Sequence, residues 1–315
     1  WLGMNNFSAA SQLSILAFTF IVVLLGIELS ARKNQKFNDP RVSSFENKFD
    51  EINLKQNIIL LSICLIPIIF GFIIPVLILI NLSLQSLNQD NFSTFLEISI
   101  NSISISFFGA FLIILFSFII VVAVKYHGGK KFAFLSTLAG SGYAFPGVIL
   151  ALGTTFFLSL VQDSINTFFI TFDVNWNLTI IGTFTALLYT YICRFNAIGI
   201  GYINSGIQRI SPNLLEAGRL QGVSFEKSLF KIIFPLIRPS ILTGFLIIFV
   251  DIIKELPVTL LLRPFNFETL ATYVYQYAKE EMLEQCALAA LLIIIIGVIP
   301  VIVINKTINL SYKKQ

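Results

Sequence analysis

Residues 56–89 read QNIILLSICLIPIIFGFIIPVLILINLSLQSLNQ and contain no charged side chain. A helix needs roughly 20 consecutive, predominantly apolar residues to cross the hydrocarbon core of a bilayer, and this stretch is longer. Inside that core, only helices and closed barrels satisfy all of their own backbone hydrogen-bonding groups. The stretch therefore predicts a membrane-spanning helix.

The same feature recurs along the whole chain. Only 12% of its residues are charged, 56% are hydrophobic and the mean hydropathy is +0.85, whereas soluble domains carry about 25% charged residues. Of the uncharged stretches, only 239–250 is shorter than a membrane span requires. We count it as a span because apolar residues resume after the charged residues that follow it and continue through Leu262. We predict an all-α, polytopic membrane protein with about seven transmembrane helices. The six further uncharged stretches are 1–27, 98–124, 132–162, 174–193, 239–250 and 285–305.

The basic residues predict the orientation of these spans. Loops rich in Lys and Arg stay on the cytoplasmic side. If the segment after the first span is cytoplasmic, all of the 21 Lys and Arg except Lys254, Arg263 and Lys279 fall in cytoplasmic segments. We therefore expect an external amino end and a cytoplasmic carboxyl end. The outer loops are net acidic and would tolerate a cationic substrate.

Several kinds of site are not expected in this chain. His127 is the only histidine, so a metal site with several histidine ligands cannot form, and a Ser-His-Asp triad would have to use this one residue. The chain has no phosphate-binding GxxxxGK[ST] motif. We predict no catalytic site, no cofactor, no metal and no nucleic-acid partner for the chain itself. The cysteines stand singly in apolar stretches, which favours a packing role; they are Cys64, Cys193 and Cys286.

The charged segment 28–55 interrupts the apolar pattern and reads as a linker between two units. We expect 1–29 to be the last span of a preceding unit, 30–55 a cytoplasmic linker and 56–315 a six-span unit. The start at Trp1 suggests the tail of something longer; a processed seven-span protein is the alternative. A signal peptide fits poorly, because no basic segment precedes the first apolar run.

The cytoplasmic segment 211–235 reads SPNLLEAGRLQGVSFEKSLFKIIFP and is too polar to span. Ser211 and Pro212 are typical of a helix start, and Gly222 can adopt the positive φ that ends a helix. We predict a second short helix over 225–233, which Pro235 halts before the next span. The segment should form a helix-turn-helix on the inner membrane surface.

The spacing of this segment resembles the EAA loop of binding-protein-dependent ABC importer permeases. In that family the consensus is EAA, three residues, Gly, nine residues and I-x-L-P, and the loop here is 205–235. The two departures, Gly218 for Ala and Phe234 for Leu, are mild. Glycine in place of alanine lowers the stability of a helix by at most about 1 kcal/mol. The resemblance implies that the short helix docks in a groove of a separate ATPase subunit. The coupling residues carried over are Glu216, Ala217, Gly218, Gly222, Ile232 and Pro235.

Two further segments resemble one branch of that family. Residues 142–153, GYAFPGVILALG, and residues 251–272, DIIKELPVTLLLRPFNFETLAT, are similar to the carboxyl-terminal half of ferric-iron ABC permeases. Those permeases are often two fused six-span halves, so the first span here would belong to a missing half. The resemblance implies a multi-pass protein of the bacterial inner membrane. The implied partners are ATPase subunits that hold ATP and Mg, a periplasmic or surface binding protein, a second permease half (fused or as a dimer) and the lipid bilayer.

The same segments carry candidate pathway residues. Pro146 breaks a helix at membrane depth, which is tolerated where neighbours or a cavity satisfy the backbone. Asp251, Lys254 and Glu255 fall within about one helical turn, and ionisable residues at such depth face the interior and pair. Two interpretations stay open: a Lys254–Asp251 salt bridge that fixes packing, or acidic side chains that screen a trivalent cation in transit.

Other functions remain alternatives. An ion-coupled secondary transporter could use Asp251, Lys254 and Glu255 as a proton relay, although only an ABC permease predicts the spacing from Glu216 to Pro235. Thiamine, phosphonates or polyamines could replace ferric iron as cargo, because selectivity in the resembled family resides largely in the binding protein. A membrane-embedded hydrolase is the weakest alternative, because the sequence offers no nucleophile–base pair.

Overall fold

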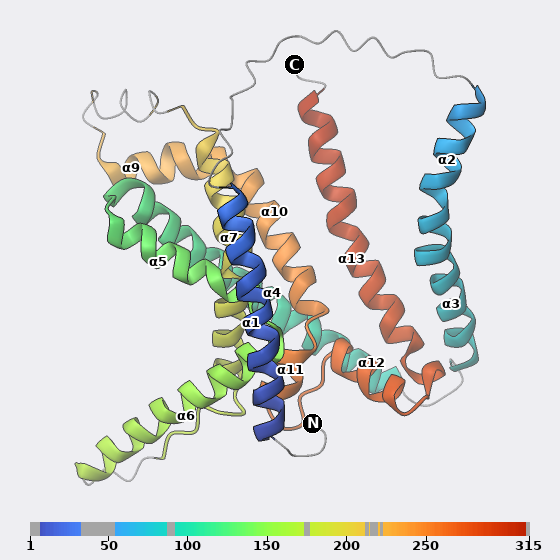
Figure 1. The fold of residues 1–315 in the computed structure, drawn as a ribbon, viewed down its shortest axis with the longest axis horizontal. Coiled ribbons are helices and arrows are strands. Elements are labelled where there is room, and N and C mark those ends of the chain that lie inside the picture. Colours follow the sequence, from blue (N-terminus) through green and yellow to red (C-terminus); the bar gives the residue numbers. More distant parts are fainter. Residues whose placement is uncertain are drawn as a thin grey trace.

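The structure is a computed structural model that describes residues 7–32, 54–86, 92–172, 177–211, 214, 220 and 223–312. These residues form helices and connecting loops and contain no β-strand. The all-α prediction is therefore confirmed (Figure 1). The helices are α1 (Phe7–Arg32), α2 (Leu54–Ile68), α3 (Ile74–Ser86), α4 (Phe92–Val122), α5 (Lys130–Ser141), α6 (Gly147–Thr171), α7 (Phe184–Gln208), α9 (Phe225–Ser228), α10 (Phe234–Ile253), α11 (Pro257–Leu262), α12 (Leu270–Lys279) and α13 (Leu283–Tyr312).

Five helical runs within the described residues are long and apolar enough to cross a membrane. A shorter apolar helix, Ile15–Leu24, lies within α1. Every predicted apolar stretch thus has a helix or helical run, and the polytopic membrane class is confirmed. The five runs are Asn57–Gln85, Phe92–Tyr126, Gly147–Thr171, Phe225–Ile253 and Leu283–Ile302.

The core forms where α4, α7 and α10 pack together. Close approach depends on small residues, as is usual between helices in membranes. A Cβ at Gly244 of α10 would lie 3.0 Å from Cβ of Tyr202 on α7. A Cβ at Gly199 of α7 would overlap the hydroxyl of Ser117 on α4, and that hydroxyl donates to Asn196 Oδ1 over 2.5 Å. These contacts make the three helices a closely packed frame for the site.

Two other helical segments lie outside this frame. The run α2–α3 stands at one edge of the molecule in Figure 1, and α3 packs against α13. The amino-terminal helix α1 packs against α6. The ring of Phe18 on α1 stacks on the ring of Phe145, with 4.7 Å between centroids. Most of the predicted linker 30–55 lies outside the described residues.

The fourth predicted span, 132–162, is not one helix. It is divided into α5 and α6 by a single 3-10 turn, η4 (Gly142–Ala144), and the extended residues that follow. Pro146 precedes the first residue of α6 and has ψ 137°, which is incompatible with a continuing helix. The break predicted at Pro146 is confirmed, and the membrane-length helix is α6 rather than the whole stretch.

The fifth predicted span, 174–193, is also corrected by the structure. Helix α7 begins at Phe184 and continues through Arg194 to Gln208. Arg194 therefore lies inside a helix and not in a cytoplasmic loop. The sequence prediction was wrong here because it treated each charge as the end of a span, whereas the charge of Arg194 is paired within the protein.

The predicted halt at Pro235 is corrected as well. Residues Phe225–Ile253 form one continuous helical run, in which α9 leads through the π-helix η5 (Leu229–Ile233) into α10. Pro235 lies in the first turn of α10 and does not end the helix, because wider π-helical turns precede it. Figure 1 shows that the ribbon changes direction here, with α9 lying across the end of the bundle and α10 descending into it.

Candidate functional site

The candidate site forms where two breaks in the helices meet the middle of α7. The first break is η4 and Phe145, between α5 and α6. It packs directly on α7, because a Cβ added to Gly142 would overlap the backbone carbonyl oxygen of Cys193. The second break is residues 254–256, between α10 and α11.

Glycine is therefore required at residue 142. Gly142→Ala should lower the free energy of unfolding by about 1–3 kcal/mol, because the backbone must shift to admit the methyl group. Gly153→Ala is the matched control, since nothing lies within 4 Å of its added Cβ, and alanine is the better helix former by roughly 1 kcal/mol. Thermal unfolding of the two purified variants checks the prediction. Equal midpoints would show that the first break does not depend on this contact.

A buried ion pair joins the second break to α7. Glu255 is 7% exposed, and its Oε2 lies 3.2 Å from Nε of Arg194. The other carboxylate oxygen, Oε1, accepts a 3.4 Å hydrogen bond from the backbone N–H of Val258 in the first turn of α11. A buried charge is expensive unless it is paired, and each of these two groups compensates the other.

Arg194 also joins α7 to the first break. Its Nη1 donates a 3.3 Å hydrogen bond to the carbonyl oxygen of Phe145, an acceptor that the break leaves free. Gly147 lies against this pair, because its added Cβ would lie 2.8 Å from Nη1 of Arg194 and 3.1 Å from Oε1 of Glu255. We call Arg194, Glu255, Phe145 and Gly147 the Arg194 junction. The junction holds three elements of the bundle in one arrangement.

A second ion pair joins the last turn of α10 to the first residue of the second break. Lys254 Nζ is 2.7 Å from Oδ1 of Asp251. The contact that the packing interpretation requires is present, whereas its role stays a prediction. The lysine is largely exposed, with 61% of its side chain accessible against 15% for Asp251. The three charges at 251, 254 and 255 belong to two separate pairs, which gives no support to a continuous proton relay.

Asp251 lines a cavity of about 420 Å³ between η4, α7 and α10. Hydroxyl and carboxylate oxygens supply its polar surface, and small residues of α7 leave the space open. Carboxylates and other oxygen donors suit hard cations. Among the described residues no group of three or more His, Cys, Asp or Glu could hold a metal ion. The lining of the cavity is Tyr143, Ala197, Ile198, Gly201, Tyr202, Ser205, Ile247 and Asp251.

The predicted pathway residues are therefore separated by role. Asp251 faces the cavity, Lys254 pairs with it from the exposed side, and Glu255 belongs to the Arg194 junction. Pro146 lies beside the junction, between Phe145 and Gly147.

The predicted coupling residues are only partly described. Ile232 is half-buried in η5 and Pro235 lies in the first turn of α10. Glu216, Ala217, Gly218 and Gly222 lie outside the described residues.

Sequence reasoning missed Arg194, Tyr143, Tyr202 and Ser205. A signal for Arg194 was present, because no further charge occurs until Arg209. The residues between them could continue a helix, which would place Arg194 in its middle. The tyrosines and Ser205 gave no such signal, since only the packing of α7 against α10 and the first break brings them to one cavity.

Comparison with known proteins extends these observations. The profile of the family described as "Binding-protein-dependent transport system inner membrane component" matches residues 114–314. The Fe(3+)-transport system permease protein FbpB 2 of Haemophilus influenzae is 23% identical over 239 residues, which cover 74% of this chain and 44% of that protein. The ferric transport system permease protein FbpB of Actinobacillus pleuropneumoniae is 26% identical over 166 residues, which cover 52% and 23%. The chain spans less than half the length of these relatives.

The fold is also similar to that of solved transporters. One chain in the crystal structure of a bacterial alginate ABC transporter, in complex with an alginate pentasaccharide-bound periplasmic protein, superposes with a TM-score of 0.60. The two chains share 17% sequence identity, and the match covers 79% of this chain and 93% of that one. A second structure, of a bacterial ABC transporter involved in the import of alginate, gives the same TM-score over 81% and 97%. At this identity the likeness shows the fold.

Proposed function

This chain belongs to the family of binding-protein-dependent transport system inner membrane components, and we propose that it forms half of the membrane pathway of an ATP-driven ferric-iron importer. The observation that carries the proposal is the family match over 114–314, which includes the predicted coupling segment and both helix breaks. In this arrangement the chain binds no nucleotide. ATP hydrolysis belongs to separate ATPase subunits on the cytoplasmic face, where the carboxyl end also lies.

Two observations support ferric iron as the cargo. Two relatives are named as ferric permeases, and the cavity beside Asp251 offers carboxylate and tyrosine oxygens. A small, hard cation fits these groups better than an acidic polysaccharide does, because a carboxylate repels another anion. A binding protein on the outer face delivers the cargo, and a second permease half completes the pathway.

Transport by the reconstituted complex tests this function. Proteoliposomes that contain the permease with its ATPase should take up radiolabelled ferric iron from the loaded binding protein, and only when ATP is inside. Addition of a proton uncoupler should not change the rate of this uptake. Uptake that is independent of the ATPase and abolished by the uncoupler would identify an ion-coupled transporter instead.

The coupling segment provides a sharper test. Glu216→Lys should reduce ATP-driven uptake roughly 5- to 10-fold, since a coupling free energy of about 1–1.4 kcal/mol between two sites changes the response by that factor. The physical reason is that Glu216 accepts from a basic or hydrogen-bonding group of the ATPase, or stabilises the segment that does so. Glu280→Lys is the matched charge reversal, because Glu280 is exposed at the end of α12, on the predicted outer side. Unchanged uptake by Glu216→Lys would remove Glu216 from the coupling segment.

A further inference from the structure

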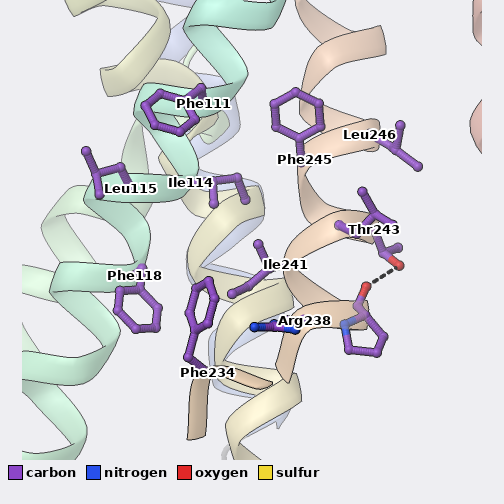
Figure 2. A pocket seen from close by; sticks show the side chains of 12 residues that line it. Phe111, Ile114, Leu115, Phe118, Phe234, Arg238, Ile241, Thr243, Phe245 and Leu246 are labelled. Carbon is purple, nitrogen blue, oxygen red and sulfur yellow. Dashed lines mark hydrogen bonds between the residues drawn. The ribbon is translucent and has the colours of Figure 1, made fainter. Parts of the chain in front are cut away.

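A large apolar pocket lies apart from the candidate site, between α4 and α10. Its volume is about 870 Å³, which falls within the roughly 300–1,000 Å³ of small-molecule pockets. Figure 2 shows aromatic and aliphatic side chains from both helices facing one another across it. The pocket is thus wide enough for a hydrocarbon chain and has walls of matching polarity. Its lining is Phe111, Ile114, Leu115, Phe118, Phe234, Arg238, Pro239, Ile241, Leu242, Thr243, Phe245 and Leu246.

Arg238 is the only charged residue in this lining. It lies at the same end of the pocket as Phe118 and Phe234 in Figure 2, with its guanidinium carbon 5.6 Å from the centre of the Phe234 ring. Within the described part of the chain, no carboxylate pairs with Arg238. Charged side chains close to a membrane are stabilised by an anion or by reaching the interface. The end of the pocket at Arg238 therefore offers a positive charge that no carboxylate of the described residues pairs with.

Two lysines extend this charge beyond the pocket. Lys227 and Lys231 precede Phe234 and Arg238 in the same helical run. Both lysines are exposed. Exposed side chains of α9 and η5 therefore add two positive charges to the segment that precedes Arg238.

We propose that this pocket binds an anionic phospholipid, with the phosphate at Arg238 and an acyl chain between α4 and α10. The apolar walls match the acyl chain of such a lipid, and the basic group at one end matches its acidic headgroup. Basic pockets between transmembrane helices bind headgroups of this kind. A second permease half is the other cover that this face could receive. A permease half would match the charge of Arg238 only if it placed an acidic side chain there, whereas every anionic lipid carries an acidic headgroup.

Lipid retention by the purified full-length complex tests the proposal. The complex in detergent is mixed with equal amounts of phosphatidylglycerol and phosphatidylcholine of identical acyl chains, and bound lipid is counted by native mass spectrometry. We expect preferential retention of phosphatidylglycerol. Arg238→Gln should weaken that retention roughly fivefold, the effect of one basic residue near an anionic lipid, without changing retention of phosphatidylcholine. Arg209→Gln, an exposed arginine after α7, should change neither.

A second variant keeps the charge and fills the slot. Leu242 is 54% exposed, so Leu242→Trp can be accommodated without disturbing the core, and it should lower retention of phosphatidylglycerol although Arg238 is intact. A photoreactive amino acid at residue 246 should label lipid. The proposal is overturned if Arg238→Gln retains phosphatidylglycerol as the parent does, or if residue 246 labels another permease segment in place of lipid.

Discussion

Replacing Arg194 by methionine should lower the free energy of unfolding by about 3–5 kcal/mol, because it leaves Glu255 as a buried charge without its partner. The same change removes the donor to the Phe145 carbonyl oxygen, so the first helix break loses its link to α7. The expected result is a large drop in the thermal midpoint of the detergent-solubilised protein. Arg209→Met should stay within about 0.5 kcal/mol of the parent, since surface substitutions away from buried networks rarely do more.

A double variant separates the ion pair from the rest of the junction. Arg194→Met with Glu255→Leu should recover most of the lost stability, because replacing both members of a buried pair by apolar groups is often neutral. Transport by this double variant should nevertheless stay low, since the Phe145 carbonyl oxygen is still without its donor. Full transport by a stable double variant would reduce the Arg194 junction to a packing feature. A small effect of Arg194→Met alone would show that Glu255 is not buried as described.

The fold class could be predicted from the sequence because the bilayer leaves few options. An uncharged apolar stretch such as 56–89 has to be helical to satisfy its backbone in lipid, and the structure has a helical run from Asn57 to Gln85. Proline gave a weaker signal. The fixed φ and missing N–H of Pro146 favour a local break, which the structure has, but Pro235 and Pro239 lie within a continuous helical run.

The site could be predicted only in part, because its members meet through tertiary packing. Asp251 and Lys254 are one turn apart, so their pairing followed from helical spacing alone. The pairing of Glu255 with Arg194 depends on how α7 crosses the second break, which no local pattern records. For the same reason the prediction ended a span at residue 193, where the chain in fact continues as helix.

The second expected large effect concerns the cavity itself. Asp251→Asn should lower ATP-driven ferric uptake about 10- to 150-fold, because a hydrogen bond to a charged group is worth roughly 1.5–3 kcal/mol. Asparagine removes the charge while it keeps the shape of the side chain. Initial rates of iron uptake into proteoliposomes measure the effect. Thermal unfolding of the same sample should change little, since Asp251 is only partly buried and its lysine partner is exposed.

Lys254→Gln distinguishes the two interpretations of this ion pair. It breaks the same 2.7 Å contact between Nζ and Oδ1 but leaves the carboxylate in the cavity. If the carboxylate serves the passing cation, Lys254→Gln should retain uptake or raise it, because the competing ammonium group is gone. If the pair only fixes helix packing, the two variants should lose uptake and stability together. Parallel losses in both variants would therefore assign Asp251 to packing and leave the cavity without its principal cation-binding group.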